Sequence, residues 1–269
     1  MNAVIRDRYK GPAMARVMSF VMAVFILVPV IAPSIGQVIL IFFNWEAIFW
    51  MFLITALLVC IWFSIRLDET LLPESRQPLS FRKIRNGMIE VLKTRTALGY
   101  TLATGFLFSP FVGYLSSSQQ IFADGYWKKD EFPLLFASLA LTFGVASLVN
   151  ARLVYRYGLK RLCFASVSVI TCLSGIFLLG ILGMDKMPPL WLFMGYMMII
   201  FPGIGFLFGN LNALAMEPLG HIAGVGAAMI GSLSSLISIP LGILIAGAFN
   251  GTVLPLVTGF SLCGLAVLF

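Results

Sequence analysis

Charged residues are scarce in this chain of 269 residues: 11% are charged, whereas 60% are hydrophobic. A soluble domain carries about 25% charged and about 45–50% apolar residues, and it could not hide so much apolar surface from water. The apolar runs are about twenty residues long and do not alternate with polar residues, as the strands of a membrane β-barrel would. The composition therefore predicts an integral membrane protein of the all-α class.

Ionisable side chains are absent from the apolar runs. The chain has one histidine, His221, and its eleven Asp and Glu residues all fall in connections or at the ends of the runs. Four cysteines fall inside the runs without metal-ligand spacing, which predicts reduced thiols that fill apolar space. We therefore expect no enzyme active site, no metal and no cofactor. The cysteines are Cys60, Cys163, Cys172 and Cys263.

Eight segments are long and apolar enough to be membrane spans, because a span needs about 20 mostly apolar residues. They are Val17–Phe42, Glu46–Ile65, Ala97–Phe122, Phe132–Ala151, Leu162–Met184, Leu190–Ala215, Ile222–Phe249 and Val253–Phe269.

The basic residues are unevenly distributed between the two sides of these spans. One side holds fifteen of the eighteen Lys and Arg residues, and the other holds only Lys128, Lys129 and Lys186. Cytoplasmic loops carry the excess of Lys and Arg, so we expect both termini to be cytoplasmic. The net charge of +7 is then a signal of topology, and we expect no nucleic-acid partner.

The segment Leu67–Arg95 differs from the other connections because it is long and polar and contains Pro73 and Pro78. Long connections without regular structure are uncommon and often have a linking role. We expect residues 67–95 to be a cytoplasmic loop between residues 1–66, with two spans, and residues 96–269, with six. Such a division is expected if four further spans precede Met1.

Two segments near the N-terminus have a distinctive order of residues. Residues 3–9 (AVIRDRY) run into Gly11 and Pro12 ahead of the first span. Residues 28–37 (VPVIAPSIGQ) place Pro29, Pro33 and Gly36 within that span. A kinking proline beside small residues lets another helix approach closely.

Two further segments fall at predicted cytoplasmic turns. Residues 150–161 (NARLVYRYGLKR) place Gly158, which permits a tight reversal, between Arg156 and Arg161. Residues 210–224 (NLNALAMEPLGHIAG) include Pro218, which is expected to end one helix and turn the chain.

Together these segments resemble the major facilitator superfamily, and within it the Bcr/CflA group of drug:proton antiporters. The resemblance implies a bacterial inner-membrane transporter built from two six-span halves, with the eight spans corresponding to spans five to twelve. Residues 28–37 resemble the antiporter motif G-x-x-x-G-P-x-x-G-G, in which Pro33 and Gly36 match. Residues 150–161 resemble the loop motif G-x-x-x-D-R-x-G-R-[KR], with Tyr155 in place of the acid.

A gating role follows from the resemblance for residues in these two motifs: Pro29, Pro33, Gly36, Arg156, Gly158 and Arg161. Because the acid is missing from the second motif, a basic anchor at the membrane surface is the favoured role there. His221, in the turn of residues 210–224, could sense pH, but a structural role is more usual for a turn histidine.

The span Ala97–Phe122 is the strongest candidate for a substrate-binding wall. Thr101, Thr104, Phe108 and Phe111 fall near one helical face, and such a surface suits small lipophilic, partly aromatic substrates. Alternatively, the hydroxyls bond their own helix backbone while the phenylalanines face lipid or neighbouring helices. Asn210 completes the predicted pathway; Asn212 lies two residues on, so at most one of the two faces the path.

The function expected from the resemblance is multidrug efflux by proton antiport and alternating access, by a monomer with small lipophilic substrates, protons and the lipid bilayer as partners. Proton coupling needs an ionisable group within the membrane, so the proton-binding carboxylates are expected in preceding spans. Two alternatives remain open: a transporter of another small solute, such as a sugar, amino acid or purine, and a truncated remnant that does not transport.

Overall fold

The computed structural model describes residues 28, 31–66, 81–183 and 187–268, and the regular elements in these ranges are all helices. The chain divides into two compact units, Met1–Leu79 and Ser80–Phe269. The predicted assignment of residues 1–66, 67–95 and 96–269 to parts of two halves stays a prediction.

The first unit contains two apolar helices, Ile31–Phe42 and α3 (Glu46–Arg66). A short turn joins them, in which the backbone N–H of Ala47 donates to the carbonyl oxygen of Asn44 at 3.0 Å. Helix α3 is apolar on all sides, and none of its residues is buried. A helix with this character is stable within a protein core or a membrane.

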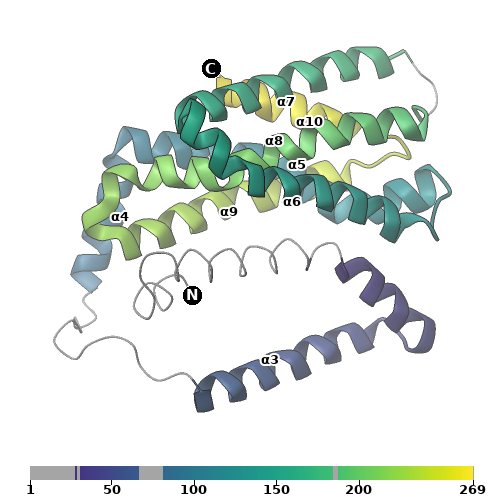
Figure 1. Cartoon of the computed structure of the whole chain (residues 1–269), viewed down its shortest axis with the longest axis horizontal. Helices are drawn as coiled ribbons and strands as arrows, with labels where there is room; N and C mark the ends of the chain where they lie inside the picture. The colour runs from purple at the N-terminus through teal and green to yellow at the C-terminus, as the bar shows by residue number, and fades with distance from the viewer. Residues whose placement is uncertain (1–27, 29–30, 67–80, 184–186, 269) are drawn as a thin grey trace. The chain divides into compact units, whose positions relative to one another are not determined.

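The second unit is a bundle of helices (Figure 1). In chain order they are α4 (Phe81–Lys93), α5 (Arg95–Gln120), the π-helical turn η2 (Ile121–Gly125), α6 (Phe132–Tyr157), α7 (Leu159–Ile181), α8 (Leu190–Met216), the 3-10 turn η3 (Glu217–Ile222), α9 (Ala223–Gly247) and α10 (Leu254–Leu268).

Five helical segments of the described chain are long and apolar enough to cross a membrane. The longest, Leu190–Gly247, is two helices, α8 and α9, joined at η3 as the Pro218 turn predicts. Ile31–Phe42 and α10 are shorter apolar helices. Each predicted span thus contains an apolar helix, which confirms a multi-pass all-α membrane protein.

Helix α4 has thirteen residues and falls inside the segment 67–95, for which the sequence analysis named a loop and no helix. The sequence of α4 repeats apolar residues at helical spacing, with Met88, Val91 and Leu92 on neighbouring turns. Val91 is fully buried, and α4 packs against α5 and α9.

Glycines bring α5 and α9 close together. A Cβ atom at Gly105 of α5 would lie 2.8 Å from Cβ of Ile237, and one at Gly242 of α9 would lie 2.9 Å from the carbonyl oxygen of Ser109. Helices in lipid associate mainly by close packing, for which small residues at the interface are needed. Helix α8 lies among α5, α6 and α7 and supplies much of the core.

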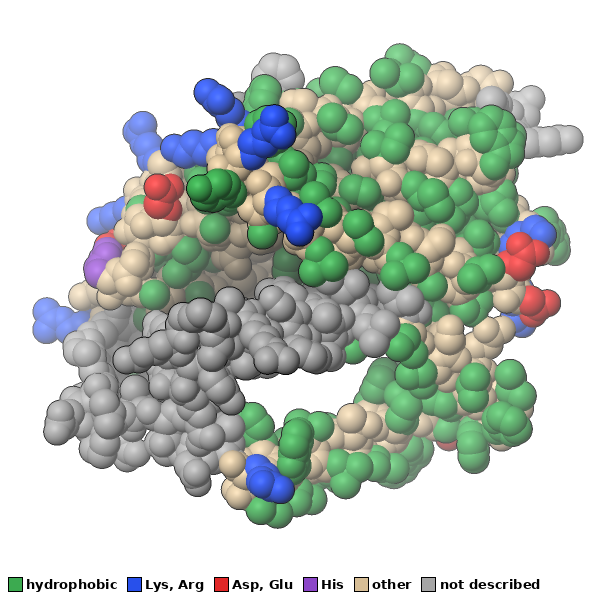
Figure 2. Space-filling model, viewed as in Figure 1, with side chains coloured by type: hydrophobic (Ala, Val, Ile, Leu, Met, Phe, Trp, Pro, Cys, Tyr) green, Lys and Arg blue, Asp and Glu red, His purple; other side chains and the backbone are tan. Residues whose placement is uncertain are grey.

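The surface of the second unit carries its charges at the ends of the bundle. Figure 2 shows charged side chains gathered toward these ends, with hydrophobic side chains over the surface between them. The exposed apolar residues include Leu179 of α7 and Leu236 and Leu244 of α9. Such a distribution fits a bundle surrounded by lipid.

Replacement of Gly242 by Ala is expected to destabilise the bundle by about 1–3 kcal/mol, because the added methyl group would overlap the α5 backbone. The measurement is the melting temperature of the purified chain in detergent. The matched control is Gly231→Ala on the same helix, where a Cβ atom meets no atom within 4 Å. Equal melting temperatures for the two variants would contradict the close approach of α5 and α9.

Candidate substrate cavity

A cavity of about 260 Å³ lies among α5, α8 and α9. Helix α5 and helix α8 contribute aromatic and amide side chains, and α9 contributes hydroxyls. The lining residues are Thr104, Phe108, Val112, Phe208, Asn212, Ile230, Gly231, Ser234, Ser235 and Ser238.

The polar part of the lining is a stripe of serines on α9. Ser234 and Ser238 are one helical turn apart, and Ser235 lies beside them. No lining residue carries a charge. An apolar cavity with a few hydroxyl and amide groups binds a ligand through its apolar area and fixes its orientation by hydrogen bonds.

The aromatic part of the lining continues into the core of the bundle. The rings of Phe108 and Phe208 lie 5.2 Å apart between centroids, and Phe108 meets Phe111 edge-on at 6.1 Å. Phe111 in turn stacks on Phe143 at 5.8 Å. Phe108 therefore lines the cavity and packs against Phe111, which in turn packs against Phe143.

The two predicted threonines have different surroundings. The hydroxyl of Thr104 lines the cavity and donates to the carbonyl oxygen of Tyr100 at 2.7 Å. Thr101 is fully buried, and its hydroxyl donates to the carbonyl oxygen of Ala97 at 2.6 Å. Its own carbonyl oxygen accepts a bond of 3.2 Å from Ser234 of α9. Both hydroxyls thus bond their own helix, as the alternative interpretation expects.

Asn210 pairs with Asn150 and does not line the cavity. The amide nitrogen of Asn150 donates to the side-chain oxygen of Asn210 at 2.9 Å, and that of Asn210 donates back at 2.8 Å. This reciprocal pair connects α6 to α8. Asn212 lies on the other side of α8 and lines the cavity instead.

Four polar or aromatic lining residues were not singled out from the sequence: Phe208, Ser234, Ser235 and Ser238. The serines could have been predicted to line a cavity, because they recur at helical spacing within an otherwise apolar span. Nothing in the sequence distinguishes Phe208 from the other phenylalanines, of which the chain has 24 in all.

The residues predicted to have gating roles lie in two places. Gly158 has φ +81° and connects α6 to α7, and its N–H donates to the carbonyl oxygen of Val154 at 2.8 Å. Arg156 is exposed, with its guanidinium 5.3 Å from the ring centre of Tyr157, and Arg161 is also exposed.

The remaining predicted gating residues belong to the first unit. Pro33 and Gly36 lie in the helix Ile31–Phe42, and Pro29 lies outside the described residues. In the ranges that the structure describes, no group of three or more His, Cys, Asp or Glu residues could hold a metal ion.

Residues 1–243 match the family model described as the Major Facilitator Superfamily. The chain belongs to this family. The match covers most of the chain and extends over both units, which confirms the predicted resemblance. The members of this family are transporters and not enzymes.

Curated relatives agree with the superfamily and with the Bcr/CflA group within it. A bicyclomycin resistance protein homolog from Haemophilus influenzae is 27% identical over 97% of this chain and 65% of its own length. The uncharacterized MFS-type transporter YdgK from Bacillus subtilis is 28% identical over 88% and 59%. The multidrug resistance protein MdtL from Shewanella is 24% identical over 92% and 62%. The chain thus spans about three-fifths of the length of these relatives.

Replacement of Asn150 by Ala is expected to destabilise the bundle by about 1–3 kcal/mol, because Asn210 would keep a buried amide without a partner. The double variant Asn150→Ala/Asn210→Ala should lose less than the sum of the single losses, with a coupling of about 0.6–1.7 kcal/mol. The measurement is a double-mutant cycle of unfolding in detergent. The control is Asn212→Ala, on the same helix but outside the pair. Additive losses at positions 150 and 210 would contradict the hydrogen bonds between Asn150 and Asn210.

Proposed function

We propose that this chain functions in the efflux of small lipophilic molecules by proton antiport and alternating access, and that the cavity among α5, α8 and α9 lies on the substrate path. The uncharged lining of the cavity carries this proposal, because it offers hydroxyls and aromatic rings but no charged side chain, and aromatic faces attract flat lipophilic molecules, including organic cations. The names of the multidrug and bicyclomycin resistance relatives support it.

Within this proposal, the predicted pathway residues have separate roles. Thr104 and Phe108 contact the substrate, Phe111 supports Phe108, and Thr101 and Asn210 hold α9 and α6 in place. None of the lining residues is ionisable, so the proton is carried at another site.

The proposed setting is a bacterial inner membrane, with the protein acting as a monomer and both termini cytoplasmic. The basic residues of α4 and of the α6–α7 turn support this orientation, because Lys and Arg concentrate on the cytoplasmic side. Arg156 and Arg161 then anchor this turn at the membrane surface, and Gly158 provides its reversal. Pro29, Pro33 and Gly36 take part in the movement of the halves.

Replacement of Phe208 by Ala is expected to weaken the binding of ethidium, a lipophilic aromatic cation, about tenfold, because the cavity loses a ring face that attracts it. Phe208 is 48% exposed, so the fold should tolerate the change. The measurement is the dissociation constant from dye fluorescence with the purified chain. The control is Leu179→Ala, at a residue that is 74% exposed on α7. Equal affinities would argue against this cavity as the binding site.

Proton antiport needs its own measurement. Proteoliposomes of this chain alone, with an acidic interior, should release no protons when ethidium is added outside, because its Asp and Glu residues fall in connections or at the ends of the spans. Proton release that an uncoupler abolishes would contradict the placement of the proton site outside these spans, while leaving the cavity proposal standing.

A further inference from the structure

Helix α4 has an exposed surface that is separate from the proposed substrate cavity. Its buried side is fixed to the bundle: Val91 is fully buried, and a Cβ atom at Gly87 would lie 2.9 Å from a methyl group of Val225 on α9. This packing determines which side chains of α4 point away from the bundle.

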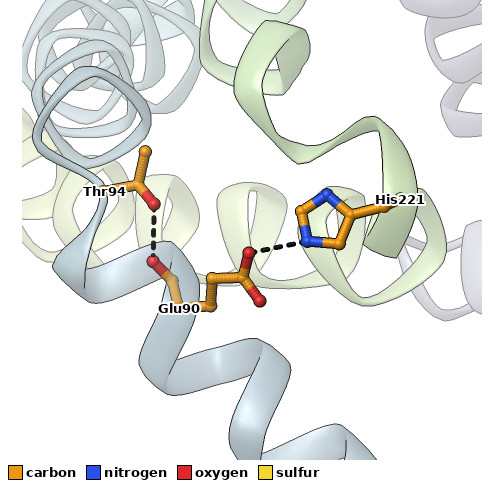
Figure 3. A network of polar contacts seen from close by, with 3 residues as sticks. All are labelled: Glu90, Thr94 and His221. Atoms are coloured by element: carbon orange, nitrogen blue, oxygen red, sulfur yellow. Dashed lines mark hydrogen bonds and ion pairs between the residues drawn. The ribbon is translucent and has the colours of Figure 1, made fainter.

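A polar contact also holds α4 at the corner where α8 turns into α9. Figure 3 shows Glu90 of α4 facing His221 of η3, with Oε1 and Nε2 at 2.6 Å. The hydroxyl of Thr94 donates to the carbonyl oxygen of Glu90 at 2.8 Å at the point where α4 ends. Helix α5 begins at the next residue, Arg95. The single histidine therefore has a structural contact, and α4 connects directly to a membrane-spanning helix.

An exposed apolar stripe runs along α4 beside its buried side. Phe81 is 91% exposed, and Met88, Ile89 and Leu92 are also exposed. On a helix, Phe81, Met88 and Leu92 fall in one line, whereas Ile89 lies farther round, beyond Arg85. Large apolar side chains exposed together mark a surface that contacts a partner or a membrane.

Basic residues border this stripe. Arg82, Arg85 and Lys93 are exposed, and residues 81–95 together contain five Lys or Arg and one Glu. A helix with an apolar stripe and a basic border lies in the interface of a membrane, with its apolar side toward the acyl chains. Clusters of Lys and Arg next to a span attract anionic lipid headgroups.

We propose that α4 is an interfacial helix that binds anionic phospholipid, with Phe81, Met88 and Leu92 in the acyl boundary and Arg82, Arg85 and Lys93 on the headgroups. The packing of Val91 and the contact between Glu90 and His221 hold α4 against the bundle so that this side faces lipid. The surface is independent of the transport proposal, since it needs neither a substrate nor a proton.

The test places a nitroxide spin label on α4 of the full chain, in a background where the four native cysteines are Ala and the melting temperature is unchanged. Leu92→Cys labels the apolar stripe, and Asn86→Cys labels the exposed polar side as the matched control. The chain is reconstituted in nanodiscs of phosphatidylcholine with or without phosphatidylglycerol. Collisions with oxygen report lipid, and collisions with a nickel chelate report water.

The ratio of oxygen to nickel accessibility should be several-fold higher for the label at position 92 than for the label at position 86, and phosphatidylglycerol should raise it further. Two outcomes would overturn the proposal: equal ratios would mean that α4 lies in water, and a label at position 92 shielded from both reagents would mean that protein covers the stripe.

Charge is tested by the triple variant Arg82→Gln/Arg85→Gln/Lys93→Gln, which should lose the response to phosphatidylglycerol. The control is Lys128→Gln/Lys129→Gln, at the opposite end of the bundle, which should keep it. A full response in the triple variant would show that the basic residues do not bind the headgroups and would overturn that part of the proposal.

Discussion

The close approach of α5 and α9 is the constraint on which the second unit depends. Gly105, Gly113 and Gly242 have no side chains at the positions where the two helices meet, and Ile237 and Ile245 pack into the space that results. Lipid offers no hydrophobic force to pull helices together, so their association depends on this fit. Larger residues at these glycines would separate the helices and open the cavity wall.

This approach also positions the polar groups of the cavity. It brings Ser234 of α9 within 3.2 Å of the carbonyl oxygen of Thr101, and so places the serine stripe beside Thr104 and Phe108 of α5. Helix α8 is held on its other sides by two polar contacts. Asn150 pairs with Asn210, and the hydroxyls of Ser174 and Tyr196 lie 2.8 Å apart. With α8 fixed by these contacts, Phe208 and Asn212 are left facing the cavity.

Much of the fold follows from the sequence because membrane helices obey strong, local rules. Their length is set by the bilayer and their apolar character by the lipid, so α5 through α10 begin and end close to the predicted boundaries. Gly158 was identifiable as a turn, and it has the positive φ that a tight reversal uses. Helix α4 was missed, because a short amphipathic helix has neither the length nor the apolar content of a span.

The cavity follows from the sequence only in part, because its lining depends on rotation of each helix against its neighbours. Spacing places Thr101, Thr104, Phe108 and Phe111 near one face of α5, and of these four only Thr104 and Phe108 line the cavity. It separated Asn210 from Asn212 but gave no reason to prefer one, since the partner that occupies Asn210 lies sixty residues away at Asn150. The serines of α9 can be assigned to the cavity only when the packing of α9 against α5 is known.

The proposed function depends most directly on the binding of substrate in the cavity among α5, α8 and α9. The measurement is the rate at which a maleimide labels Asn212→Cys in the chain with its four native cysteines changed to Ala, with and without ethidium. Asn212 lines the cavity, whereas Leu179 on α7 is exposed on the outer surface. We expect ethidium to slow labelling at position 212 and to leave labelling of Leu179→Cys unchanged. Labelling at position 212 at the same rate with saturating ethidium would contradict the account.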